Sequence, residues 1–159
     1  MAPELRLSMN ATLSDNHFVR YREVYGTAPG DTVVYDGNTI GFFPTILGNL
    51  SARFAWRRAT VGTDIQHVGR MYLDHTESNE GSIAPRTVMN LFAGYRFPLR
   101  ASDPLASPAP AIDFSLRVFN ALDRRYETGG YSYLYAGTRY TDFIPAASRS
   151  ILAEVRVGF

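Results

Sequence analysis

The chain has 159 residues, and its 16 lysine and arginine residues nearly balance its 15 aspartate and glutamate residues. Such a balanced charge does not favour a nucleic-acid-binding protein. The absence of cysteine excludes disulfides, thiol nucleophiles and thiolate metal sites. No apolar run approaches the roughly 20 residues of a membrane helix, and the first ten residues lack the pattern of a signal peptide. We therefore expect either a cytoplasmic protein or an internal piece whose signal lies upstream.

Six stretches of the chain alternate apolar and polar residues with a period of two, which predicts six β-strands. The stretches span residues 4–13, 46–56, 61–73, 88–97, 112–120 and 150–159. In the first, apolar side chains at positions 5, 7, 9, 11 and 13 alternate with polar ones at positions 6, 8, 10 and 12. The pattern predicts an all-β fold, an antiparallel up-and-down meander of about six strands.

Nearly every charged residue in these stretches falls on the less apolar parity, so one face of the predicted sheet carries no charge. The charged residues on the polar parity are Arg6, Arg53, Arg57, Asp64, Arg70, Arg96, Asp113, Arg117, Glu154 and Arg156. Four residues break the pattern. Thr63 and His67 fall on the apolar parity, while Phe92 and Phe119 fall on the polar one.

The connections between the predicted strands differ in length. Those after the first, third and fifth strands, at 14–45, 74–86 and 123–149, are long, while those after the second and fourth are the short 57–60 and the proline-rich 98–111. An up-and-down sheet places alternate connections at opposite ends, so the long loops gather at one end. Long extracellular loops and short periplasmic turns are typical of outer-membrane barrels, and a ten-residue tilted strand covers their apolar band of roughly 25 Å.

Aromatic residues gather near the predicted strand ends, as in the girdles of membrane barrels. They are Trp56, Tyr95, Phe97 and Phe159 at the turn end, and Tyr72 and Tyr126 toward the loop end.

Four stretches resemble motifs of TonB-dependent outer-membrane receptors and follow that family's order along the chain. Residues 117–131, RVFNALDRRYETGGY, resemble its late-strand corner, with Asn120, Leu122, Asp123 and Tyr126 at matching positions and Ala121 inserted before Leu122. Residues 67–80 resemble a hairpin near the end of the barrel, residues 14–21 a strand-to-loop exit, and residues 145–159 the terminal strand. Together these stretches are distributed over most of the chain, from residue 14 to residue 159.

The resemblance implies that residues 1–159 are the C-terminal portion of a receptor β-barrel. Complete receptors of this kind close about 22 strands around an N-terminal plug. Six strands fall short of the ~8 that the smallest outer-membrane barrels need. We therefore expect the plug domain and earlier strands to be absent here, in a piece of a longer receptor or a truncated reading frame.

The function implied by the resemblance is active transport rather than enzymatic catalysis. Such a receptor lies in the outer membrane of a Gram-negative bacterium and imports a scarce ligand, such as a ferric siderophore for iron uptake or cobalamin, with energy from TonB. The implied partners are outer-membrane lipid, the plug and remaining barrel strands, the TonB complex and the outer-membrane assembly machinery. No cofactor is expected.

The loop sequence GGYSYLYAGTRY combines several tyrosines with an arginine. This mixture suits stacking on an aromatic or anionic chelate, and we predict a ligand-binding loop there. Its residues are Tyr131, Tyr133, Tyr135, Arg139 and Tyr140.

The last predicted strand ends on a large aromatic residue. By resemblance, Val155, Val157 and Phe159 match the apolar positions of the signal that the assembly machinery reads. Alternatively, Phe159 only anchors a sheet edge at the membrane interface.

No residue set predicts catalysis or metal binding. His17, His67 and His75 are scattered and lack zinc-ligand spacing. The acidic stretch 74–80 lacks the EF-hand pattern, so a solvated loop is favoured over a calcium site.

Two other interpretations fit the alternation. A soluble sheet with one buried face has the same pattern, so a soluble up-and-down barrel or sandwich that binds an apolar small molecule stays open. An outer-membrane enzyme barrel would need a nucleophile and a base in one loop layer, and the sequence shows none.

Overall fold

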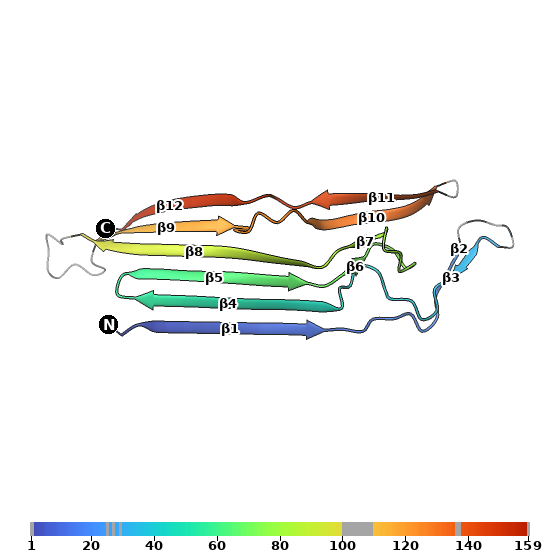
Figure 1. Ribbon diagram of the computed structural model, residues 1–159, viewed down its shortest axis with the longest axis horizontal. Coiled ribbons are helices and arrows are strands. Elements are labelled where there is room, and N and C mark those ends of the chain that lie inside the picture. Colours follow the sequence, from blue (N-terminus) through green and yellow to red (C-terminus); the bar gives the residue numbers. More distant parts are fainter. Residues whose placement is uncertain are drawn as a thin grey trace.

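The computed structural model describes residues 2–24, 26, 28, 30–99, 110–135 and 138–158. Within these ranges the chain forms twelve strands and no helix, and six of the strands make one antiparallel sheet in the order β1-β4-β5-β8-β9-β12 (Figure 1). These six strands are β1 (Glu4–Leu13), β4 (Ile46–Trp56), β5 (Ala59–Val68), β8 (Arg86–Pro98), β9 (Ala111–Phe119) and β12 (Ser150–Gly158). The predicted all-β, up-and-down fold of six strands is confirmed.

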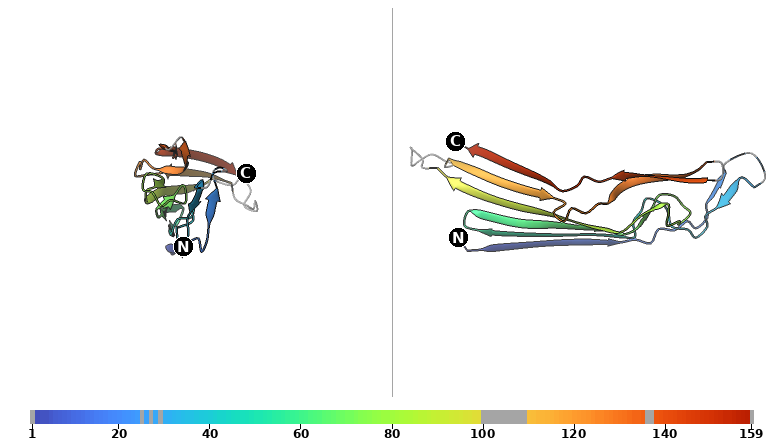
Figure 2. Two further views of the ribbon diagram at one scale, coloured as in Figure 1. Left: turned by 90° about the vertical axis from the view of Figure 1, so that its right-hand side faces the viewer. Right: turned by 45° about the horizontal axis from the view of Figure 1, so that its top comes forward.

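The three long connections are not plain loops, because each contains a further hairpin. The hairpins pair β2 (Arg22–Val24) with β3 (Thr32–Val34), β6 (Met71–Tyr72) with β7 (Ser82–Ile83), and β10 (Glu127–Tyr135) with β11 (Thr138–Pro145). All three extend from the same end of the main sheet, opposite the two chain termini (Figures 1 and 2). The predicted gathering of long connections at one end is therefore confirmed.

The third strand is shorter than predicted. β5 ends at Val68, and the residues that follow Gly69 and Arg70 start the separate β6–β7 hairpin. The Gly69 amide donates to the carbonyl of Ile46 (2.8 Å), which marks the end of the β4–β5 ladder.

The register keeps the two faces of the main sheet separate across all six strands. One row of register partners crosses the apolar face through Leu5, Phe54, Val61, Ala93, Leu116 and Ala153. The neighbouring row crosses the polar face through Arg6, Arg53, Gly62, Phe92, Arg117 and Leu152. Since a slip of one residue would invert a strand's faces, this alignment holds the charge-free face intact.

No other described part of the chain covers the apolar face. Leu7 is 68% exposed and Met9 is 78% exposed, and the same face of the later strands is also open. The buried hydrophobic residues are instead Tyr35, Val68, Leu73, Ile83 and Ala111. The described residues thus lack the closed apolar core that a soluble barrel or sandwich requires.

Among the described residues there is no helix that could cross a bilayer.

The polar residues that break the pattern on the apolar face have local hydrogen-bond partners. His67 Nδ1 lies 2.9 Å from Thr87 Oγ1, and the Thr63 hydroxyl donates to the Asn90 carbonyl (3.0 Å). Each polar group therefore bonds to the neighbouring strand, which lowers the cost of placing it on this face.

Phe92 breaks the pattern on the polar face, and it lies between two cations. The guanidinium carbons of Arg53 and Arg117 are 5.8 and 5.7 Å from its ring centroid. Gly62 makes room for this arrangement, because a Cβ there would lie 2.5 Å from Arg53 Cδ. The aromatic ring is thus held among charges by cation–π contacts rather than by apolar packing.

Candidate functional site

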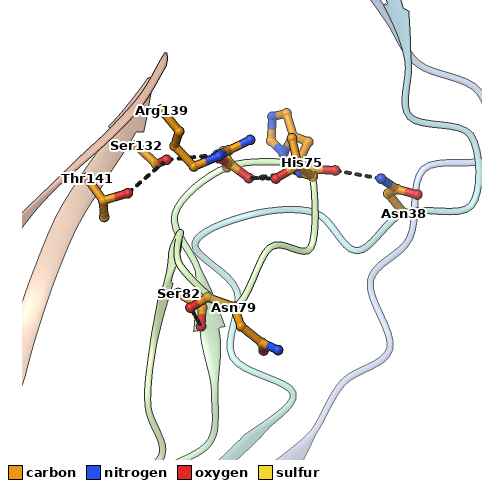
Figure 3. A network of polar contacts seen from close by, with 9 residues as sticks. Asn38, His75, Asn79, Ser82, Ser132, Arg139 and Thr141 are labelled. Atoms are coloured by element: carbon orange, nitrogen blue, oxygen red, sulfur yellow. Dashed lines mark hydrogen bonds and ion pairs between the residues drawn. The ribbon is translucent and has the colours of Figure 1, made fainter. Parts of the chain in front are cut away.

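The β6–β7 loop and the β10–β11 hairpin are joined by a partly buried ion pair. Arg139 on β11 forms an ion pair and hydrogen bond with Asp74 and also donates to Ser132 Oγ (2.9 Å) (Figure 3). The side chains of Asp74 and Arg139 are 17% and 20% exposed. Thr141 donates to Ser132 (3.3 Å) and extends the network along the hairpin.

Asp74 is held in its charged form by its neighbours. Burial raises the pKa of this carboxyl, but the Thr76 hydroxyl (2.6 Å), the Thr76 amide (2.8 Å) and Arg139 together lower the pKa below its ordinary value of 3.8. Because the lowered pKa belongs to the folded state, the carboxylate stabilises the loop fully above its ordinary pKa. That contribution is lost as the pH falls through the folded-state pKa.

We expect Asp74→Asn to loosen the β10–β11 hairpin at neutral pH, because Arg139 then loses its counter-charge. The expected cost is about 1–3 kcal/mol, as for a hydrogen bond to a charged group. Hydrogen exchange of the β10 and β11 amides would show it as faster exchange confined to this hairpin. Asp15→Asn is the matched control, since the Asp15 side chain is 86% exposed. Equal exchange in Asp74→Asn and the control would contradict the expectation.

The β2–β3 segment packs on the same loop through aromatic rings. The Phe18 and Tyr21 rings stack at 4.5 Å, Tyr35 lies 5.9 Å beyond Tyr21, and the His75 ring meets all three edge-on. The Gly41 amide donates to His75 Nδ1 (3.2 Å), so the imidazole is held inside this cluster.

Polar bonds reinforce the same contact. Asn38 Nδ2 donates to the His75 carbonyl (2.7 Å, Figure 3), and Glu77 Oε1 accepts from the amide and hydroxyl of Thr39 (2.8 and 2.5 Å). The Thr39 hydrogen bonds lower the pKa of Glu77. The acidic stretch 74–80 is thus engaged in protein contacts, and no group of three His, Cys, Asp or Glu residues suited to a metal ion occurs in the described ranges.

The tyrosines of the predicted ligand loop share one face of the β10–β11 hairpin. The rings of Tyr131 and Tyr133 stack at 6.2 Å, and those of Tyr133 and Tyr140 at 5.6 Å, with interplanar angles of 21° and 18°. Tyr133 and Tyr140 are direct register partners, and Tyr135 follows at the next position of the same parity. All four side chains are exposed.

Arg139 does not belong to this tyrosine face. It pairs with Leu134 in the register, one position away from the Tyr133–Tyr140 pair, so it lies on the opposite face with Ser132 and Asp74. That opposite face packs closely on the β6–β7 hairpin, because a Cβ at Gly130 would lie 2.9 Å from Leu73 Cδ1. The structure therefore brings the tyrosines together and separates the arginine from them.

The corner motif at Asn120 is a buried hydrogen-bond network rather than an exposed site. Buried Asn120 donates from Nδ2 to the carbonyls of Arg124 (2.9 Å) and Ala147 (3.2 Å), and its Oδ1 accepts from the Arg124 amide (3.0 Å). Its own amide donates to Asn90 Oδ1 (2.9 Å). One side chain thus joins the β9–β10 corner to the approach of β12, and its amide bonds to β8.

The other motif residues have different surroundings. Asp123 accepts from the Arg149 amide (2.8 Å), Tyr126 stacks under the Arg86 guanidinium at 5.6 Å, and Leu122 is exposed. Both Asn120 and Asp123 have left-handed backbones, with φ of 49° and 50°. Asparagine and aspartate tolerate this conformation better than other side chains, which explains their place in the corner.

The polar face of the main sheet carries a chain of amides. Gln66 Nε2 donates to Asn49 Oδ1 (3.2 Å), and Asn49 Nδ2 donates to Asn10 Oδ1 (2.9 Å), so three strands are linked side chain to side chain. One row away, Asp64 accepts from Ser51 (2.7 Å) and pairs with Arg53 (2.7 Å). These polar groups suit a surface in contact with water. The alternation in the sequence predicts that they lie on this face.

In the terminal strand, Val155 and Val157 lie on the apolar face opposite Phe114 and Ile112. Both valines are exposed. Phe159, the third residue of the predicted assembly signal, lies outside the described residues.

The sequence matches no family model and no curated protein. Among solved structures, the chain is similar to the crystal structure of the siderophore receptor PiuA from Acinetobacter baumannii, with a TM-score of 0.68 and 18% sequence identity. The match covers 95% of this chain and 19% of that receptor's chain, so the chain spans about a fifth of the length of the protein it matches. At this identity the likeness shows the fold alone: the chain has the fold of a segment of a siderophore receptor.

Proposed function

We propose that the chain is part of the β-barrel wall of an outer-membrane receptor that imports a scarce ligand, such as a ferric siderophore, with energy from TonB. The main observation in favour of this proposal is that the sheet forms a single layer and its charge-free face is open across all six strands. In a bilayer that face meets hydrocarbon, while the amides and ion pairs of the other face line a wet lumen.

The two edge strands of the sheet, β1 and β12, support the proposal that it is part of a larger barrel. In the described residues β1 pairs only with β4, and β12 pairs only with β9. Each edge therefore presents unpaired backbone groups, which lipid cannot satisfy. We propose that the remaining strands of a longer receptor cover both edges, that residues 1–159 are its C-terminal portion, and that a plug domain fills its lumen.

Nitroxide labels at two neighbouring positions of β1 test the membrane orientation. We expect a label at Leu7→Cys to collide mainly with lipid-soluble oxygen, because position 7 lies on the apolar face. A label at Ser8→Cys is the matched control and should collide mainly with a water-soluble nickel reagent. The measurement is the ratio of the two collision rates in the protein reconstituted in vesicles. The same ratio at both positions would reject the proposed function.

The exposed tyrosine face is the part of the chain that we propose to contact the ligand. Aromatic stacking is worth ~0.5–1.5 kcal/mol, so Tyr133→Ala in the complete receptor should weaken ligand binding about 2- to 10-fold. Tyr133→Phe keeps the ring and should bind like the wild type. Titration of ligand against the purified receptor measures the difference, and unchanged affinity in Tyr133→Ala would remove this face from the site.

A further inference from the structure

A hollow of about 980 Å³ lies at the turn end of the main sheet, at the β4–β5 hairpin. Trp56 is the register partner of Ala59, and Ala59 is the register partner of Tyr95, so a small residue lies between two large aromatic ones. All three belong to the apolar face. We call this hollow, lined by Trp56, Arg57, Arg58, Ala59, Thr60, Tyr95 and Arg96, the turn-end pocket.

Two arginines at the turn-end pocket lack an acidic partner within the part of the chain that the structure describes. Arg57 and Arg58 form the two-residue turn between β4 and β5, and both are exposed. The Arg57 guanidinium lies 4.7 Å from the Trp56 ring. By contrast, the Arg96 guanidinium is paired with Asp113 at 3.2 Å. The pocket therefore carries two arginines that form no ion pair in the described residues, next to apolar surface.

The backbone at Arg57 adds a second observation. Its φ is 54°, in the left-handed region, where a hairpin turn normally carries glycine or asparagine. An arginine at such a position is strained, and strained residues cluster at functional sites. Structural needs of the turn do not explain the choice of this side chain.

We propose that the turn-end pocket binds an anionic glycerophospholipid, with the phosphate at Arg57 and Arg58 and an acyl chain over Ala59 between Trp56 and Tyr95. The proposal rests on the proposed function, since it requires the apolar face to meet lipid. Arginine binds phosphate through paired N–H donors, and aromatic rings favour the boundary between headgroups and hydrocarbon. At the pocket the apolar face adjoins the charged turn directly. A phospholipid has the same order, with its acyl chains next to its phosphate headgroup.

Native mass spectrometry tests the proposal on the complete receptor in detergent micelles doped with phosphatidylglycerol or with zwitterionic phosphatidylcholine. The wild type should retain phosphatidylglycerol preferentially. Arg58→Ala and Arg57→Gly should each reduce that retention about fivefold, since an arginine near an anionic lipid surface contributes ~1 kcal/mol. Arg57→Gly also relieves the positive φ, so loss of retention there cannot come from a destabilised turn.

Two further variants separate charge from shape. Ala59→Leu fills the floor of the pocket with the charges intact and should also reduce retention. A double variant, Arg124→Ala with Arg125→Ala, removes two exposed arginines from the corner between β9 and β10 and should leave retention unchanged. Equal loss in this control would overturn the proposal in favour of a general charge effect.

The remaining outcomes of these experiments also test the proposal. A receptor that enters micelles but shows no preference for phosphatidylglycerol overturns the lipid site and leaves the proposed function standing. Displacement of the lipid by equimolar inorganic phosphate would overturn the acyl-chain part, because it would show that the phosphate alone is recognised. A protein that stays soluble without detergent would reject the proposed function itself.

Discussion

Asn120→Ala is expected to destabilise the protein by about 3 kcal/mol, because it removes three side-chain hydrogen bonds from a buried corner. Alanine also fits poorly at φ of 49°, which asparagine tolerates. The loss affects the β9–β10 corner and the approach of β12 together, since the Asn120 side chain bonds to Arg124 and Ala147, while the backbone bond to β8 is kept. The measurement is the denaturant midpoint of the folded protein in detergent.

Two control substitutions divide this effect. Asn120→Gly loses the same bonds but adopts the left-handed backbone freely, so it should be about 1 kcal/mol more stable than the alanine variant. Asn120→Asp keeps the acceptor for the Arg124 amide but sets a carboxylate oxygen against the carbonyls of Arg124 and Ala147 in a buried corner, so it should be no more stable than the alanine variant. An alanine variant with the wild-type midpoint would show that the corner carries no stability.

Leu116→Arg is expected to cost about 2–4 kcal/mol in a bilayer, the range for arginine on the lipid face of a barrel near the midplane. Leu116 is 43% exposed on the apolar face between Ala93 and Ala153. The cost arises because hydrocarbon cannot solvate the guanidinium. Equilibrium unfolding from phospholipid vesicles measures it.

Ser115→Arg is the matched control on the next residue of the same strand. Its side chain lies on the polar face opposite Glu154, where a guanidinium finds water and a carboxylate. We expect it to change stability by less than about 0.5 kcal/mol. If both variants unfold at the same denaturant concentration, the two faces share one environment and the membrane orientation is wrong.

The main sheet was predictable because its information is local. Alternation across ten residues, as in Leu5 to Leu13, needs only the period of a strand and one side free of charge. The distal hairpins were not predictable in this way. In β10 and β11 both faces carry polar or mixed residues, such as Ser132 beside Tyr133, so no contrast marks the strands.

The candidate loop was predicted in composition but not in arrangement. Tyr133 and Arg139 are close in sequence, and the chemistry of both suits a ligand. Only pairing of the strands shows that they lie on opposite faces, with Arg139 committed to Asp74, which is 65 residues away. A contact of that separation leaves no local pattern, so the sequence favours a solvated loop for the acidic stretch.

The sequence by itself determined which side of each main strand is apolar and which end of the sheet carries the long connections, because both follow from the order of residues along the chain. The corner at Asn120 was implied by the family resemblance. The tertiary structure alone decided that the apolar face stays open and that the β2–β3 segment and the β10–β11 hairpin both contact the β6–β7 loop. It also decided that Trp56, Ala59 and Tyr95 line one hollow. These features join strands distant in the chain, and register, which strand pairing sets, determines which side chains meet.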